Sequence, residues 1–242
     1  MRLKININTK NNFKIPFSYN HILSSIIYNK IADLDLAHEL HTSKSFKFFN
    51  FSQLNIPKRK IVDDGIIAKN GKINFYLSSP DNLLIKNIVS GFVDDLEIKF
   101  KNDTWVVEKI EALKTPDFTE NSEFKTLSPI NVRDVNDENK RVDLAPSDKF
   151  FKGVENNLIK KYCIFNGIEN TDKMIKVYSE MANVKRKRIT IPKGPNTTYH
   201  RAYMMDLIIE GDVGLIEFAY DVGLGEKNSM GFGMIKYIEP KK

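Results

Sequence analysis

The sequence predicts an α+β protein of two tandem domains, each with its elements in the order β-α-β-β-α-β. At 242 residues the chain is long for one small domain and sufficient for two of about 120 residues each. Apolar spacing alternates between period two and helical period in an order that occurs in residues 1–117 and again in residues 118–242. This order is the ferredoxin-like pattern. The halves share the pattern only, because no close sequence repeat links them.

The first strand and the first helices follow from simple periodicities. Apolar and polar residues alternate over 3–7, which predicts a half-buried strand. Leucine and isoleucine recur at helical spacing over 18–31, which predicts a helix that faces the core. A second, short helix is expected over 34–41, with Asp33 or Asp35 as its N-cap.

The rest of the first domain is predicted from aromatic content and turn residues. An aromatic-rich strand is expected over 45–54. Asn70-Gly71 predicts a type I′ hairpin between strands over 61–69 and 72–77. Ser79, followed by a proline, is the expected N-cap of a helix that reaches Phe92. Two short strands close the domain, over 96–100 and 105–107.

The second domain is expected to begin after a boundary at Pro116-Asp117. Its first helix is capped by Ser147 and ends near Gly167, and a short buried helix covers 213–222. The charged tract 134–143 is predicted to be a surface loop. Apolar alternation predicts strands over 123–135, 176–181, 184–191, 199–210 and 234–238.

Composition and charge restrict the class of protein. A hydrophobic content of 41% supports real cores, and a formal charge of +6 makes a polyanionic partner plausible. Cys163 is the only cysteine, so neither an intrachain disulfide nor a cysteine-based zinc site can form. The N-terminus lacks the apolar core of a signal peptide, and no stretch approaches the length of a membrane helix. We therefore expect a protein of a reducing cytoplasm without membrane partners.

Residues 223–233 are the most distinctive stretch. Two Gly-apolar-Gly triplets, Gly223 to Gly225 and Gly231 to Gly233, flank five mostly polar residues. Such a segment can present backbone N–H groups to a phosphate, and Lys227 adds a positive charge, although a plain glycine-rich turn is the simple alternative. A dinucleotide-binding loop is excluded because Asn228 stands where a third glycine is required, and no P-loop motif occurs.

Histidines are the candidate proton-transfer groups. His38 and His41 lie at i and i+3 of one predicted helix and so share a face, whereas His21 and His200 stand alone. The pair could bind a metal, transfer protons, or do neither. The metal alternative lacks ligands, because Glu39 points to another face and His-Glu-Leu-His is not the zincin motif. Proton transfer suits histidine at neutral pH.

Two groups of motifs together resemble the Cas6 family of CRISPR-repeat endoribonucleases, which belong to the RAMP superfamily. The first group is Leu40-His41, then Lys47 and the run Phe51-Ser52-Gln53-Leu54. The second is the glycine segment, which matches the family signature of two Gly-apolar-Gly triplets before the final strand. The resemblance spans both ends of the chain and also implies two tandem ferredoxin-like domains.

The resemblance implies metal-independent cleavage of precursor CRISPR RNA within its repeats, with no cofactor. A ribose 2′-OH would attack the adjacent phosphate and leave a 2′,3′-cyclic phosphate and a 5′-OH. Carried over, His41 is the general acid or base, Lys47 stabilises charge on the phosphate, and Tyr28 is the candidate third residue. His38 has no family counterpart but is near enough to assist.

The resemblance also names partners and leaves alternatives. Besides the repeat RNA, the implied partners are a Cascade-like CRISPR effector complex and a second copy of the chain. The resemblance also implies a prokaryotic protein, archaeal or bacterial, with an archaeal Cas6b-type as one alternative. A non-catalytic RNA-binding or scaffold protein of the same fold is the first alternative. A metal-dependent hydrolase that uses His38 and His41 is the second, and it predicts loss of activity with a chelator.

Basic residues indicate where RNA would be held. The densest stretch is Lys185-Arg186-Lys187-Arg188, and Lys58-Arg59-Lys60 is a second cluster near the histidines. Either could simply be a solvated face. The expected RNA-binding residues are these four of the dense stretch together with the glycine-segment residues Gly223, Gly225, Lys227, Asn228, Gly231 and Gly233. Phe48 or Phe51 could stack on a base, although aromatic strands are more often core.

Overall fold

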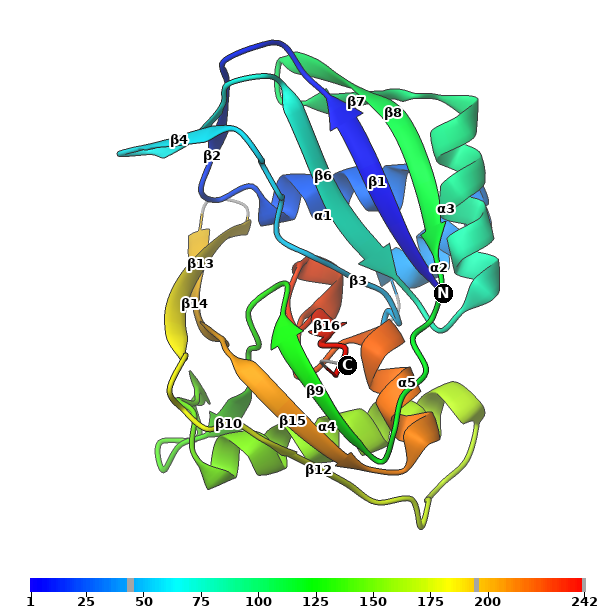
Figure 1. The fold of residues 1–242 in the computed structure, drawn as a ribbon, viewed down its shortest axis with the longest axis vertical. Coiled ribbons are helices and arrows are strands. Elements are labelled where there is room, and N and C mark those ends of the chain that lie inside the picture. Colours follow the sequence, from blue (N-terminus) through cyan, green and yellow to red (C-terminus); the bar gives the residue numbers. More distant parts are fainter. Residues whose placement is uncertain (43–45, 194–195, 241–242) are drawn as a thin grey trace.

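The structure is a computed structural model that describes residues 1–42, 46–193 and 196–240. For residues 39–42, 193 and 196 it describes the backbone only. Figure 1 shows two domains, one above the other. The green segment that follows β8 (Asp103–Leu113) connects the upper domain to the lower one. No helix among the described residues is long and apolar enough to cross a membrane.

The N-terminal domain is an antiparallel sheet covered by helices. The strand order is β3-β6-β1-β8-β7, in which the first four strands have the ferredoxin-like order. The strands are β1 (Arg2–Asn8), β3 (Asn50–Phe51), β6 (Lys72–Ser78), β7 (Glu97–Phe100) and β8 (Asp103–Leu113). The helices are α1 (Asn20–Asn29), α2 (Leu34–Thr42) and α3 (Asn82–Asp94). Buried side chains of the sheet and of α1 and α3 form one hydrophobic core.

The C-terminal domain repeats this plan around a second core. Its sheet has the order β12-β15-β9-β16, which is again the ferredoxin-like order. The strands are β9 (Asn121–Thr126), β12 (Ile175–Tyr178), β15 (Asp206–Gly211) and β16 (Ile235–Tyr237), and the helices are α4 (Asp148–Asn166) and α5 (Val213–Val222). The predicted architecture of two ferredoxin-like domains is therefore confirmed. The predicted boundary after residue 117 lies between β8 and β9 and stays a prediction.

Three small strand groups are added to this frame. The first is a sheet of β2 (Phe13–Pro16), β5 (Gly65–Ala68) and β4 (Arg59–Val62), in that order. The other two are hairpins, β10 (Arg133–Val135) with β11 (Arg141–Asp143), and β13 (Lys185–Lys193) with β14 (Asn196–Met204). The β13–β14 hairpin extends from the C-terminal domain towards the N-terminal one (Figure 1).

The predicted hairpin around Asn70-Gly71 is wrong. The strand before it, β5, pairs with β2 and β4, whereas the strand after it, β6, pairs with β1 and β3. Gly71 has a φ of +66°, and a Cβ there would also lie 2.1 Å from the carbonyl oxygen of Thr9. The glycine therefore allows a left-handed backbone and a close approach to Thr9, in a turn whose flanking strands do not pair with each other.

Several predicted boundaries also differ from the structure. Helix α3 is capped by Asp81, whose carboxylate accepts from two backbone N–H groups, and not by Ser79. Of the expected strand over 45–54, residue 45 lies outside the described residues, and within 46–54 only Asn50–Phe51 form a strand. The charged tract 134–143 contains hairpin strands. The expected strand over 199–210 is two strands, which meet at Met205 and belong to different sheets.

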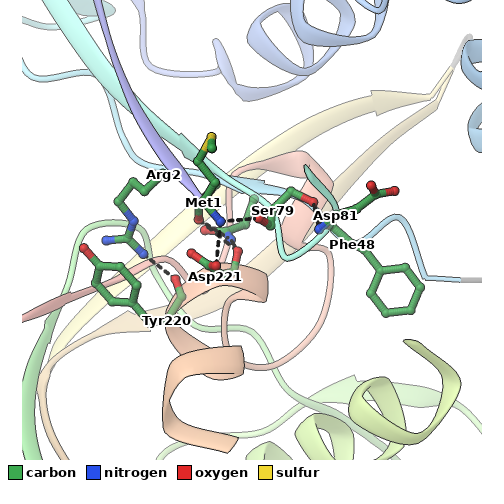
Figure 2. A network of polar contacts seen from close by, with 9 residues as sticks. Met1, Arg2, Phe48, Ser79, Asp81, Tyr220 and Asp221 are labelled. Carbon is green, nitrogen blue, oxygen red and sulfur yellow. Dashed lines mark hydrogen bonds and ion pairs between the residues drawn. The ribbon is translucent and has the colours of Figure 1, made fainter. Parts of the chain in front are cut away.

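The two domains are joined by buried polar contacts at the end of α5 (Figure 2). The Arg2 guanidinium, 2% exposed, lies 3.4 Å from the centre of the Tyr220 ring and donates to the carbonyl oxygens of Tyr220 and Ile235. The Met1 amine contacts the Asp221 carboxylate at 2.6 Å. Asn50 and Ser78 donate to the Asp221 carbonyl at 2.8 and 2.9 Å. The last carbonyl groups of a helix have no hydrogen-bond donors within the helix. Residues of the N-terminal domain supply these donors at the C-terminal end of α5.

Candidate nucleic-acid site at the domain junction

A pocket of about 590 Å³ lies where the two domains meet beside the glycine segment. The N-terminal domain contributes residues 46–49, and the C-terminal domain contributes α4, the β10–β11 hairpin and residues 226–229. The described residues that line it include six basic side chains and two acidic ones. The basic ones are Lys47, Arg133, Arg141, Lys160, Lys161 and Lys227. Such an excess of positive charge in a concave site attracts a polyanion.

The four glycines of the segment are buried, and the arc between them is half-buried. Gly233 has a φ of +77°, and a Cβ there would lie 1.8 Å from the carbonyl oxygen of Leu224, so only glycine fits. The Leu224 N–H donates to the Gly233 carbonyl at 2.8 Å, which closes the segment at its base. The glycines therefore build the shape, and the arc 226–230 is the part that a ligand can reach.

Asn228 and Lys161 hold the arc from within. The Asn228 side-chain N–H₂ donates to the carbonyls of Leu224 and Phe232, one from each Gly-apolar-Gly triplet, at 3.1 and 3.0 Å. The Lys161 ammonium, from α4, donates to the Asn228 side-chain oxygen at 2.7 Å. Burial lowers the pKa of Lys161 to about 7, against the raising effect of Glu226.

Glu226 fixes the start of the arc to the β10–β11 hairpin. Its carboxylate accepts from the Arg133 Nε at 2.8 Å, from the guanidinium Nη2, and from the Arg133 backbone N–H at 3.0 Å. Its own backbone N–H donates to the Asn131 carbonyl at 2.8 Å. Arg133 is therefore already paired, while Arg141 and Lys160 complete the basic wall.

Helix α1 supports the other end of the arc with three polar residues at i, i+4 and i+8. Asn20 donates to the Met230 carbonyl at 3.1 Å, and Ser24 donates to the Ser229 carbonyl at 2.7 Å. Burial raises the pKa of Tyr28, and a side-chain hydrogen bond with Ser229 opposes that rise. These residues share one helix face, so the N-terminal domain sets the position of the arc.

Residues 46–49, which include Lys47, form the part of the pocket wall that comes from the N-terminal domain. Phe48 has a φ of +46°, its carbonyl accepts from the Ser79 hydroxyl at 2.6 Å, and its ring contacts that of Phe165 on α4. The Tyr28 ring packs edge-on against Phe49. Burial lowers the pKa of Lys47. The structure thus brings Lys47, Tyr28 and Lys227 to one junction.

The two histidines are on α2, and the structure describes them unequally. His38 is exposed. The backbone of His41 lies in the last turn of α2, but its side chain is outside the described part of the structure. Among the described residues, no three His, Cys, Asp or Glu side chains form a group that could hold a metal ion.

The predicted basic stretch lies on β13, outside the pocket. Lys185, Arg186, Lys187 and Arg188 are all exposed, and the Arg188 guanidinium lies 4.0 Å from the centre of the Tyr199 ring. Further along, Ile189 packs against Phe232 of the glycine segment. The cluster 58–60 is also exposed. Phe51 is fully buried, so base stacking by its ring, one of our alternatives, is wrong.

Several site residues were not predicted from the sequence, although signals for some were present. Lys161 follows Phe150, Val154 and Leu158 at the helical spacing of their buried face, so a lysine there is out of place. Asn20 and Ser24 form a polar stripe on a helix rich in isoleucine. For Arg133, Arg141 and Lys160 we find no signal in the sequence.

The fold and the junction define a double ferredoxin-like protein with a basic pocket beside a glycine-rich arc. The family model described as CRISPR associated protein Cas6, C-terminal, matches residues 113–237, and the one described as CRISPR-associated protein Cas6, N-terminal, matches residues 14–111. The chain belongs to the Cas6 family.

Individual relatives agree with this assignment. CRISPR-associated endoribonuclease Cas6 1 of Methanocaldococcus jannaschii is 38% identical, over 100% of this chain and 94% of its own length. CRISPR-associated endoribonuclease Cas6 of Pyrococcus furiosus is 31% identical, over 93% of this chain and 84% of its own. A solved Cas6-related protein of Pyrococcus furiosus has a TM-score of 0.89 at 30% identity, over 100% and 99% of the two chains. A solved structure described as a RAMP protein binding different RNA substrates has a TM-score of 0.87 at 29% identity, over 99% and 100%.

Proposed function

We propose that the protein is an endoribonuclease that cleaves precursor CRISPR RNA within its repeats. Family membership and relatives that are named CRISPR-associated endoribonucleases support this activity. The observation that carries the proposal is the junction pocket, where Lys47 shares a strongly basic cavity with the arc that Tyr28 contacts. Cleavage of a phosphodiester needs positive charge where the phosphate binds, and this pocket supplies it.

The reaction we propose is an internal transesterification without a metal ion. The 2′-oxygen of the ribose forms a bond to the adjacent phosphorus as the bond from phosphorus to the 5′-oxygen breaks. A base takes the proton of the 2′-OH, and an acid gives a proton to the leaving 5′-oxygen. The products are a 2′,3′-cyclic phosphate and a 5′-OH, and no water is consumed.

Each step has a candidate residue. His41 transfers a proton, as the general acid or the general base, and such a group is typically worth about 10²–10⁴-fold in rate. Lys47 neutralises charge on the non-bridging oxygens, a contribution of about 2.7–4 kcal/mol for a preorganised donor. Tyr28 orients the substrate or assists proton transfer next to Ser229, and His38 is the second histidine that can assist.

The RNA would follow positive charge away from the pocket. Lys227 and Asn228 on the arc are proposed to contact the backbone at the cut. The exposed β13 residues 185–188 are proposed to hold a neighbouring part of the repeat, because β13 packs next to Phe232 and so continues from the arc. Gly223, Gly225, Gly231 and Gly233 serve RNA binding by shaping the arc.

Cleavage with excess EDTA tests the proposal directly. Wild type is expected to cut repeat RNA at one position with EDTA present, and His41→Ala is expected to lose about 10²–10⁴-fold in the single-turnover rate while retaining RNA affinity. His38→Ala is the matched variant on the same helix and is expected to lose less. Activity that EDTA abolishes would instead support the metal-dependent hydrolase.

A non-catalytic RNA-binding protein is the second candidate. It is favoured by the neighbour that is described as a RAMP protein binding different RNA substrates. Tight binding of the repeat by wild type, with no cleavage under any of these conditions, would establish this alternative. We further propose that the protein acts in the cytoplasm, where it can form a homodimer or deliver its product to a Cascade-like complex.

A further inference from the structure

Lys161 is a buried lysine for which the proposed reaction has no role. It lies on α4 beneath the glycine segment and is 1% exposed. Lysine is among the residues least often fully buried without an ionic partner. Here its ammonium donates to two backbone carbonyls, of Gly223 at 3.0 Å and of Gly225 at 2.7 Å, and to the Asn228 side-chain oxygen at 2.7 Å.

All three acceptors belong to the glycine segment, and their number equals the number of N–H donors of an ammonium group. A neutral amine would have two N–H donors and a lone pair, and that lone pair would face one of the three oxygens. The observed arrangement therefore suits the charged form of Lys161. The acidic residue of the arc, Glu226, accepts from Arg133 instead, so the three acceptors named above for the Lys161 ammonium are two carbonyl oxygens and an amide oxygen.

The direction of these carbonyls matters to an anionic ligand. A carbonyl oxygen carries partial negative charge and repels a phosphate, whereas backbone N–H groups attract it. Lys161 draws the oxygens of Gly223 and Gly225 into the interior. Through Asn228, which itself binds one carbonyl in each triplet, the same ammonium acts on both ends of the arc.

We infer that Lys161 is a positioning residue, which holds the glycine arc in its RNA-binding shape by keeping three acceptor oxygens turned away from the pocket. The inference rests on the proposed function for its consequence on RNA, but its structural part does not. A charge in the wall of the pocket also adds to the attraction for RNA. Lys161 thus anchors the arc through hydrogen bonds that an apolar side chain at this position of α4 could not form.

The charged form is expected to be lost in the neutral range, since burial lowers the pKa of Lys161 to about 7. The other charged groups that line the same pocket are Lys47, Arg133, Asp134, Arg141, Lys160, Glu226 and Lys227. Among these, Glu226 is the group that acts on the Lys161 pKa, and it favours the charged form.

Amide hydrogen exchange of the free protein tests the inference without RNA. In Lys161→Met, the N–H groups of Leu224 and Glu226 are expected to exchange about tenfold faster or more, the factor that corresponds to removal of a hydrogen bond from a charged donor. Strands β1 and β6 should keep their protection. Lys152→Met is the control, because it removes from the same helix an exposed lysine that contacts Glu155 and not the glycine segment.

A second variant separates a positioning role from a general loss of packing. Asn228→Ala leaves the Lys161 ammonium in place but removes the side chain through which it reaches both triplets, and it should raise the same two exchange rates. Repeat-RNA affinity should be weaker by about 10–100-fold in Lys161→Met. Exchange rates of the Leu224 and Glu226 N–H groups that equal those of wild type in either variant would overturn the inference. Wild type that neither binds nor cuts RNA would overturn the proposed function instead.

Discussion

Replacing Gly233 by alanine tests whether the glycine segment is held by close packing as well as by backbone conformation. Gly233 has a φ of +77°, and its added Cβ would lie 1.8 Å from a backbone oxygen, that of Leu224, which cannot move aside like the end of a flexible side chain. Gly167, in the same domain, has a φ of +64° with nothing within 4 Å of its added Cβ. An alanine at either position would have to adopt a left-handed conformation, but only at position 233 would its Cβ also clash with a backbone oxygen.

The magnitudes follow from that difference. A left-handed conformation costs an alanine about 1–2 kcal/mol, which is the whole expected effect of Gly167→Ala. Overpacking adds about 1–3 kcal/mol, so Gly233→Ala should lose about 2–5 kcal/mol of unfolding free energy. For a chain of this size each kcal/mol corresponds to about 2–4 °C in Tm.

Denaturant and thermal unfolding, followed by circular dichroism, measure both variants. Gly233→Ala should be the less stable of the two and should also bind repeat RNA more weakly, because the base of the arc opens. Equal losses in the two variants would refute the reasoning, since conformation alone would then account for both.

Three further predictions concern charge. Lys47→Ala should lower the single-turnover cleavage rate by about 10²–10³-fold with little change in Kd, as expected for charge stabilisation in the transition state, and an equal loss in affinity would assign Lys47 to binding only. Replacing Lys185, Arg186, Lys187 and Arg188 by glutamine should reduce the salt dependence of RNA binding by about 0.7 in the log–log slope for each phosphate that these side chains neutralise, and an unchanged slope would remove β13 from the RNA path. His200 has its pKa lowered by burial, with Lys227 and Arg133 acting in the same direction and Asp143 against it. Because the unfolded state then takes the proton more readily, the stability due to neutral His200 is present above the unfolded pKa of about 6.5 and is lost as pH falls below it. Denaturant midpoints at about pH 7.5 and pH 5.5 should therefore differ less in His200→Gln than in wild type.

The periodicity of apolar residues was sufficient to predict most helices and strands, because each domain buries one face of its sheet against two helices. Helix α4 was predicted with both ends, since Ser147 and Gly167 carry unambiguous cap chemistry. Strand partners were harder. Residues 65–68 were expected to pair with the strand after Asn70-Gly71, but they pair with β4, through a turn at 63–64, and with β2. Gly71 lies against Thr9, a contact that no local pattern predicts.

The site could be predicted in its motifs but not in its construction. The resemblance to Cas6 proteins selected Lys47, Tyr28 and the glycine segment, which the structure brings to one junction. It did not select Lys161 or Ser24, because each acts through a hydrogen bond to a distant backbone carbonyl. A sequence pattern records which residues recur, whereas such contacts depend on how the two domains meet.

The most direct test of the central claim is cleavage of two repeat RNAs by wild type, identical except for one 2′-deoxyribose at the cut. We predict that the all-ribose RNA gives a 2′,3′-cyclic phosphate and a 5′-OH. The deoxy RNA should bind with the same Kd and remain intact. Cleavage of the deoxy RNA at the same position, or a product with a 5′-phosphate, would contradict the account, because water rather than the 2′-OH would then be the nucleophile.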